Sequence, residues 1–298
     1  MLVFLNGRFV PEEQAVVSVF DRGFLYGDGL FETLRVFNGK PFRWKQHLER
    51  LQRGAEFLKI KLPFAAEALR AFAGELIVKN QMPDSLLRLT LSRGVGVRGY
   101  SPQGAEHPAL VMSLHPSPGA PASGPAPPGR FRRHAGSETG APQAWKLITS
   151  SFRLPAGEPL AQFKTCCKLP QILARAEADA AGADEALLLN TEGFVVEAAG
   201  SNLFWIEGGA VCTPSLASGV LPGVTRAAVL EICRSLGFRC RESGVTSEKL
   251  KRSEGIFLSL SSWGVVAAKS LDGEALKQSP LIGQLRLAYR DLVRSETA

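Results

Sequence analysis

The apolar positions of the first 115 residues follow two periods, one typical of strands and one typical of helices. The segment MLVFLNGRFV predicts a strand, a turn at Asn6-Gly7 and a second strand. Strands and turns are then expected to alternate up to residue 42. Apolar residues recur every three or four positions over 43–59 and again over 65–80, which predicts two helices. The runs SLLRLTLSRG and PALVMSLHP predict two strands that flank a glycine-rich loop at 94–107. This half of the chain is therefore expected to be α+β.

A segment without any apolar period follows. Residues 116–129, PSPGAPASGPAPPG, are nearly all proline, glycine, alanine and serine. Such a composition cannot pack a core and is typical of an extended linker. We therefore predict an N-terminal α+β domain at 1–115, an interdomain linker at 116–129 and a C-terminal domain at 130–298.

The second half again mixes both periods. AWKLITSSF and DEALLLN predict strands, and FVVEAAGSNLFWIEGGAVCTP and GIFLSLSSWGVVAAKSLDG predict several more. Two helices are predicted from Thr225 to Gly237 and over 281–293. A helical stripe is also predicted, made of Leu169, Ile172, Leu173, Ala176 and Ala180.

Composition and charge narrow the class of protein. The chain has 298 residues, of which 45% are hydrophobic and 21% charged, which is ample for a globular core. Its net charge of +7 is spread out, and no basic stripe alternates with aromatic residues, so we expect no nucleic-acid partner. No run of 18 apolar residues occurs, so we expect no membrane partner. Five cysteines without a visible secretion signal indicate free thiols in a reducing cytoplasm.

The stretch FKTCCKLPQ, residues 163–171, combines two lysines with two adjacent cysteines. Cys166 and Cys167 lack the C-x-x-C spacing, and no histidine lies at ligand spacing, so we predict no metal site and treat both as small buried packing residues. The segment GVGVRG has no βαβ unit around it, and G-x-S-x-G is absent, which argues against a dinucleotide site and a serine hydrolase. A lysine nucleophile remains, and by local environment both Lys164 and Lys168 are candidates.

Several motifs occur in order along the chain: DRGFLYGDGLFETLRV, TEGFVVEAAGSNLFW, GVLPGVTR and SLSSWGVV. Together they resemble the class IV, fold-type IV family of enzymes that depend on pyridoxal 5′-phosphate (PLP). This family includes branched-chain and D-amino acid aminotransferases and aminodeoxychorismate lyase. The resemblance implies an α/β (α+β) protein of two domains, a smaller N-terminal and a larger C-terminal one, with PLP at the domain interface.

The resemblance also implies which lysine is catalytic. The family has a Schiff-base lysine on a strand, followed thirteen residues later by an acid on the next helix. Lys164 has that spacing to Glu177, whereas Lys168 does not, so Lys164 is expected to form the Schiff base and to move the proton at the substrate Cα. Where the family often has asparagine, three residues after the lysine, this chain has Cys167.

Further cofactor contacts follow from the family pattern. Glu197 matches the acid that pairs with the pyridine nitrogen and keeps it protonated, and Arg50 matches a phosphate-binding arginine. Gly223, Val224 and Thr225 lead into a helix whose free N–H groups suit a phosphate. The cofactor-binding residues implied are Arg50, Lys164, Glu197, Ser201, Asn202, Val224, Thr225, Ser261 and Ser262.

On the substrate side, the resemblance points to Phe31, Arg98 and Tyr100. Phe31, together with Leu30, would line the pocket wall, while Arg98 and Tyr100 lie on a loop that supplies donors for a substrate carboxylate. In related aminotransferases this loop reaches in from the neighbouring subunit, which implies a homodimer with shared active sites.

Two reactions remain open on this scaffold. We expect an aminotransferase that exchanges an amino group between an amino acid or amine and a 2-keto acid. The alternative is 4-amino-4-deoxychorismate lyase, which releases pyruvate and p-aminobenzoate. The sequence does not identify the amino donor, the acceptor or the preferred stereochemistry.

Overall fold

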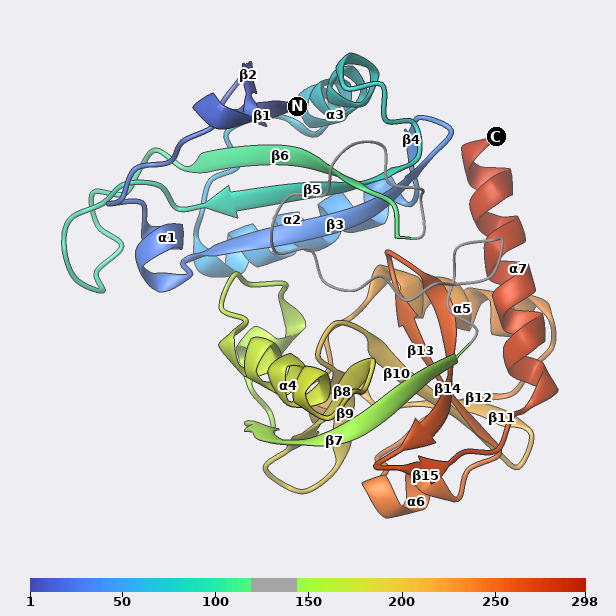
Figure 1. The fold of residues 1–298 in the computed structure, drawn as a ribbon. Helices are drawn as coiled ribbons and strands as arrows, with labels where there is room; N and C mark the ends of the chain where they lie inside the picture. The colour runs from blue at the N-terminus through green and yellow to red at the C-terminus, as the bar shows by residue number, and fades with distance from the viewer. Residues whose placement is uncertain (119–143) are drawn as a thin grey trace. The chain divides into compact units, whose positions relative to one another are not determined.

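The computed structural model describes residues 1–118 and 144–298, which form two compact units (Figure 1). The first unit comprises Met1–Pro116, Phe163–Lys168 and Val293–Ala298. The second comprises, among the described residues, 117–118, 144–162 and Leu169–Leu292. Most of the predicted linker at 116–129 lies outside the described residues, and the domain boundaries at 115 and 130 stay a prediction.

Among the described residues of the first unit, six strands form one antiparallel sheet in the order β2-β1-β6-β5-β3-β4. The β1–β2 hairpin turns at Asn6-Gly7, as predicted, and both residues have positive φ angles of 49° and 92°, which the turn requires. The strands are β1 (Leu2–Leu5), β2 (Arg8–Pro11), β3 (Gly29–Phe37), β4 (Lys40–Pro41), β5 (Ser85–Ser92) and β6 (Ala109–Pro116).

Two helices, α2 (Trp44–Leu58) and α3 (Ala66–Lys79), pack against this sheet. Side chains of a strand alternate between its faces, so Leu30, Leu34 and Val36 of β3 point into the shared core. The intervening Phe31 and Thr33 therefore lie on the opposite face of the sheet. In Figure 1, α2 runs along β3. Both helices lie where the apolar period predicted them.

The second unit is built on a mixed sheet. Among its described residues, the strand order is β12-β11-β10-β13-β14-β7-β8-β9, with β15 paired to β14. The pairs of β7 with β8 and with β14, and of β11 with β12, are parallel. The strands are β7 (Ala144–Leu154), β8 (Glu185–Asn190), β9 (Val195–Ala198), β10 (Asn202–Glu207), β11 (Ala210–Thr213), β12 (Cys240–Glu242), β13 (Gly255–Leu260), β14 (Gly264–Leu271) and β15 (Glu274–Ala275).

Helices and short 3-10 turns complete the chain. The predicted helices at 225–237 and 281–293 are confirmed as α5 (Val224–Ser235) and α7 (Pro280–Thr297), the latter longer than expected. The remaining elements are α1 (Arg22–Tyr26), α4 (Leu169–Ala180), α6 (Ser247–Lys251), η1 (Glu12–Gln14), η2 (Pro159–Gln162) and η3 (Leu216–Ser218).

Two sequence-based predictions differ from the structure. The predicted helix is confirmed as α4, but its apolar stripe is not the packed face: Leu169 and Ile172 are exposed, and Ala174 and Ala178 pack inward instead. The region 1–42 was expected to hold only strands and turns, yet it contains α1. Asp21 caps this helix by accepting hydrogen bonds from the backbone N–H groups of Gly23 and Phe24, and Gly27 ends it in the left-handed conformation.

Candidate active site

Lys164 belongs to the first unit because its segment pairs with the start of β3. The Phe31 N–H donates to the Lys164 carbonyl over 2.9 Å, and the Cys166 N–H donates to the Gly29 carbonyl over 2.9 Å. Thr165 forms a bridge with Leu30. Lys164 was expected on a strand of the C-terminal domain, but it lies in a short segment that adds to the edge of β3.

A cationic cluster surrounds the ring of Phe31. The ammonium of Lys164 lies 4.6 Å from the ring centroid, and the guanidinium carbon of Arg88 lies 4.0 Å from it. The side chain of Arg88, on β5, forms no hydrogen bond or ion pair with any residue that the structure describes. The side chains of Phe31 and Arg88 share the sheet face opposite α2. Leu30 lies in the core on the α2 side, so it does not share a wall with Phe31 as predicted.

Beneath this face lies a buried acid held by two basic side chains of α2. The Nε of Arg50 donates to Glu32 Oε1 over 2.8 Å, and its Nη2 donates to Oε2 over 2.6 Å. His47 Nδ1 lies 2.7 Å from the same Oε2. Burial raises the pKa of Glu32, but Arg50 and His47 outweigh it and lower that pKa to about 2. Burial in turn lowers the pKa of His47. The trio is therefore a carboxylate–guanidinium pair with a neutral imidazole.

The cysteines beside Lys164 are free thiols that differ in environment. Cys166 is partly buried, and burial raises the pKa of its thiol. Cys167 is exposed, contrary to the expected packing role. Its Sγ donates to the carbonyls of Tyr26 and Gly27 over 3.4 and 3.5 Å. Cys167 thus ties the Lys164 segment to the end of α1.

In the second unit, Glu197 and Asn202 hold the same peptide. The Leu221 N–H donates to Glu197 Oε2 over 3.2 Å, and Asn202 Nδ2 donates to the Leu221 carbonyl over 2.9 Å. Leu221 directly precedes the turn into α5. The two residues were predicted as cofactor ligands, and the structure brings them together at this turn.

The start of α5 has the features of an anion-binding site. Gly223 is its N-cap and supplies no side-chain acceptor for the first N–H groups, which have no partner within a helix. A Cβ at Gly223 would lie 1.9 Å from Asn202 Oδ1, so only glycine fits. Val224 and Thr225, the first residues of the helix, are buried.

Three further residues that were predicted as cofactor ligands, Ser201, Ser261 and Ser262, also lie in the second unit. The hydroxyl of Ser201, next to Asn202, is buried and has no hydrogen-bond partner among the described residues. Ser261 and Ser262 are half-buried in the turn between β13 and β14. Glu177, whose spacing from Lys164 guided the lysine assignment, accepts hydrogen bonds from Ser150 Oγ and from the Ser151 N–H and Oγ.

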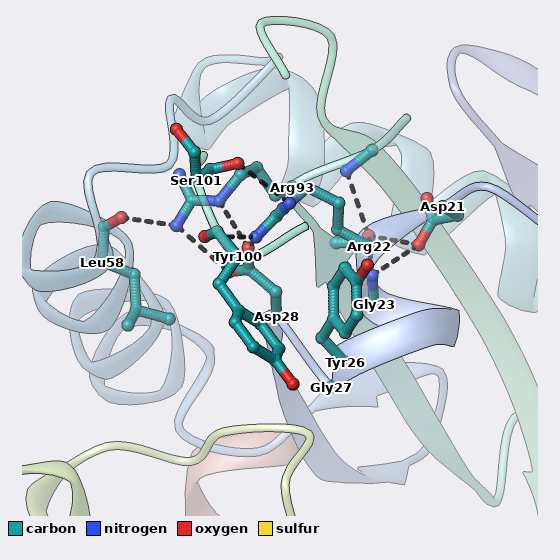
Figure 2. Close-up of polar contacts among 12 residues, drawn as sticks. Asp21, Arg22, Gly23, Tyr26, Gly27, Asp28, Leu58, Arg93, Tyr100 and Ser101 are labelled. Atoms are coloured by element: carbon teal, nitrogen blue, oxygen red, sulfur yellow. Dashed lines mark hydrogen bonds and ion pairs between the residues drawn. The ribbon is translucent and has the colours of Figure 1, made fainter. Parts of the chain in front are cut away.

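Arg98 and Tyr100 lie exposed on the loop after β5 in the first unit. Figure 2 shows that the backbone of this loop meets the buried Arg22. In residues 1–118 and 144–298, no group of three or more histidine, cysteine or acidic side chains could hold a metal ion. Within the same residues, no helix is long and apolar enough to cross a membrane.

Comparison with known proteins identifies the family. Residues 29–271 match the family described as amino-transferase class IV. A putative branched-chain-amino-acid aminotransferase of Methanocaldococcus jannaschii is 34% identical over 98% of this chain and 96% of its own length. The chain therefore belongs to the class IV aminotransferase family, whose enzymes depend on PLP.

Two solved structures show the same fold. The branched-chain amino acid aminotransferase from Thermoproteus uzoniensis, solved with norvaline, has a TM-score of 0.87 and 28% identity, and the match covers 99% of this chain and 95% of that one. The 4-amino-4-deoxychorismate lyase from Pseudomonas aeruginosa has a TM-score of 0.81 and 33% identity, over 97% of this chain and 98% of that one. Both expected reactions are thus represented among similar proteins.

Sequence reasoning missed Arg88, His47 and Arg22. Arg88 alternates with leucines on β5, so its pattern predicts only a polar face of a strand. His47 occupies a polar position of a helix, where a solvated side chain is the usual outcome. The sequence around each residue does not show which residue of another element it contacts. In each case that contact is what suggests a function for the residue.

Proposed function

We propose that this protein is a PLP-dependent aminotransferase that exchanges an amino group between an amino acid and a 2-keto acid. The observation that carries the proposal is the cluster at Phe31, where the amine of Lys164 and the guanidinium of Arg88 approach one aromatic ring. A lysine amine beside an arginine that lacks a carboxylate partner among the described residues suits a substrate with an amino group and a carboxylate.

The residues of the second unit fit the cofactor. The uncapped start of α5 offers backbone N–H donors to the phosphate, and Thr225 can add its hydroxyl. The buried Ser201 hydroxyl has a free hydrogen-bonding capacity that a bound polar group would use. Asn202, Val224, Ser261 and Ser262 complete the proposed cofactor contacts of this unit, and Arg50, on α2 of the first unit, is the remaining proposed contact.

Bound PLP would supply an aldehyde for the amino group and a ring that takes up the electron pair of the broken Cα–H bond. Lys164 then provides the amine that holds the cofactor and moves the proton at the substrate Cα. Glu197 keeps a proton on the ring nitrogen, because a carboxylate there favours the protonated form. Phe31 orients the substrate, and Arg88 together with Arg98 receives its carboxylates.

An apolar surface of the first unit supports a homodimer. It comprises residues 16–25 and residues 95–100, two segments that are joined by the bridge between Asp21 and Val95. Exposed apolar patches of this kind mark interaction sites, and a second copy of this chain is the partner that the shared active sites require. We call it the α1 patch, and its exposed members are Val16, Val17, Val19, Phe20, Phe24, Leu25, Val95, Val97 and Tyr100.

The lyase reaction is the second candidate, and the 33% identity with the Pseudomonas aeruginosa lyase favours it. The aminotransferase is preferred because the M. jannaschii relative has the higher identity, 34%, and the match with the T. uzoniensis enzyme has the higher TM-score, 0.87 against 0.81.

Assays of the pure protein test the proposal. With pyruvate or 2-oxoglutarate and a panel of D- and L-amino acids, we expect a new amino acid and a new keto acid in equal amounts. Lys164→Ala should abolish both this transfer and the visible absorbance of the purified protein. Lys168→Ala serves as the matched control and should retain both. Pyruvate release from aminodeoxychorismate without transfer to any keto acid would refute the aminotransferase.

A further inference from the structure

Arg22 is a buried arginine that binds the backbone of the loop after β5. It is 4% exposed, although it lies in the first turn of the short helix α1. Its Nη1 donates to the carbonyls of Gly99 and Ser101 over 2.9 and 3.0 Å, and its Nη2 donates to the Tyr100 carbonyl over 3.1 Å. Three consecutive carbonyls thus converge on one guanidinium (Figure 2).

This convergence requires an unusual backbone. Successive carbonyls of an extended chain point in opposite directions, so three of them can meet one cation only if the chain turns. Gly99 makes the turn with a φ angle of +108°, which side chains rarely allow. A Cβ at Gly96 would lie 3.0 Å from Arg22 Cδ, so the path of the arginine is also tight. The loop conformation and the arginine therefore depend on each other.

The other end of Arg22 is anchored. Its Nε donates to Asp28 Oδ2 over 2.9 Å, and Arg93 holds the same carboxylate through Nε over 2.7 Å and Nη2 over 3.0 Å. Arg93 also donates to the carbonyls of Leu58 and Lys59, where α2 ends, over 2.8 and 3.2 Å. A continuous chain of contacts therefore runs from the loop through Arg22, Asp28 and Arg93 to α2, the helix of His47 and Arg50.

Tyr26 adds a second hold on the loop. Its hydroxyl accepts a hydrogen bond from the Gly99 N–H over 3.3 Å, and its ring meets the Tyr100 ring edge-on at 5.6 Å. The guanidinium of Arg22 lies over the Tyr26 ring at 5.1 Å. The backbone of the loop thus faces inward, while Arg98 and Tyr100 remain exposed.

We propose that Arg22 is a positioning residue that fixes the loop at 98–101, so that Arg98 is presented in one orientation to the substrate carboxylate. The role of Arg98 in this inference rests on the proposed function. The clamp, by which we mean the hydrogen bonds from Arg22 to the carbonyls of Gly99, Tyr100 and Ser101, does not. Lysine cannot replace Arg22, because an ammonium lacks the planar set of donors that reaches three carbonyls and a carboxylate together.

The test compares Arg22→Lys with Arg93→Lys in the full-length protein with bound PLP. Both variants keep a cation beside Asp28, but only Arg22→Lys removes the contacts to the loop carbonyls. We expect amide hydrogen exchange in the peptide covering 97–104 to become at least about tenfold faster in Arg22→Lys, because local opening sets the exchange rate. The exchange of β5 should stay unchanged. In Arg93→Lys the loop should exchange as in the wild type.

Kinetics then test the effect on substrate. In Arg22→Lys the KM of amino donor and keto acid should rise about 10- to 100-fold while kcat stays within about threefold, since a misplaced Arg98 weakens binding. Tyr26→Phe should show the same change to a smaller extent. Loop exchange like that of the wild type, or a loss of kcat at constant KM, would overturn the proposal.

The two hypotheses fail separately. If the wild-type protein transfers no amino group, the proposed function is wrong. In that case a faster-exchanging loop in Arg22→Lys still supports the clamp, and an unchanged loop refutes it.

Discussion

At the scale of single residues, the charge of Glu32 determines how α2 is held against β3. Its carboxylate is 2% exposed and accepts hydrogen bonds from Arg50. Its pKa of about 2 lies below the ordinary 4.5. Glu32 therefore stabilises the fold fully above about pH 4.5, and this contribution is lost as the pH falls from 4.5 towards 2.

Glu32→Gln is expected to lower the free energy of unfolding at pH 7 by about 3–5 kcal/mol, because it removes the buried carboxylate that accepts two hydrogen bonds from the buried Arg50. Below pH 4.5 the difference from the wild type should shrink, since Glu32 of the unfolded wild-type chain then becomes protonated, which favours unfolding, while the folded carboxylate stays charged down to about pH 2. Urea unfolding at a series of pH values measures both effects. The control is Glu49→Gln, which removes an exposed acid next to Arg50 on α2 and should change the stability little. A deficit independent of pH would contradict the prediction.

The limits of sequence reasoning are clearest among these residues. The roles expected for Glu197 and for the turn into α5 came from the family resemblance, because the motif that carries each of them lies within one short segment. The clamp of Arg22 joins residues 77 to 79 positions apart, and the Glu32–Arg50 pair joins two elements. Such contacts depend on how the strands pair and how the helices pack, which local patterns do not encode.

At the scale of elements, the end of α1 and the Lys164 segment meet in one tight contact. Gly27 ends the helix with a φ angle of +68°, and a Cβ there would lie 2.7 Å from the Sγ of Cys167. Gly27→Ala should therefore lower the free energy of unfolding by about 2–3 kcal/mol, through backbone strain and the clash with sulfur.

The double variant Gly27→Ala/Cys167→Ala should recover about 1 kcal/mol relative to the sum of the single changes, because the clash is relieved. Gly39→Ala is the matched control. Gly39 also has a positive φ of +75°, but a Cβ there would meet nothing within 4 Å. Gly39→Ala should lower the free energy of unfolding through backbone strain alone, and its effect should simply add to that of Cys167→Ala. Additive effects at Gly27 and Cys167 would refute the contact.

A comparison of α2 with α4 shows when the apolar period of a helix predicts its packed face correctly. In α2 the period predicted the helix and its face, because large apolar side chains fill the space above the sheet. In α4 the same period marked Leu169 and Ile172, yet the helix packs through Ala174 and Ala178. Small residues let the helix approach β7 and β8 closely, and periodicity alone does not distinguish a packed face from an exposed apolar one.

At the scale of the whole molecule, the open question is which subunit supplies Arg98. The α1 patch and the loop with Arg98 lie side by side in the first unit, joined by the bridge from Asp21 to Val95. A second copy that covers this patch would therefore also meet the loop. This arrangement predicts that each active site combines Lys164 of one subunit with Arg98 of its partner.

Heterodimers with two different affinity tags test this prediction. Assayed at substrate concentrations well below KM, the Lys164→Ala homodimer should be inactive and the Arg98→Ala homodimer nearly so, but a heterodimer of the two keeps one complete site of two if Arg98 acts across the interface. It should then show about half of the wild-type activity. The reciprocal control pairs a wild-type subunit with a subunit that carries both substitutions. Because its single intact lysine would face a defective partner loop, this heterodimer should be inactive, whereas an Arg98 that serves its own subunit would reverse both results.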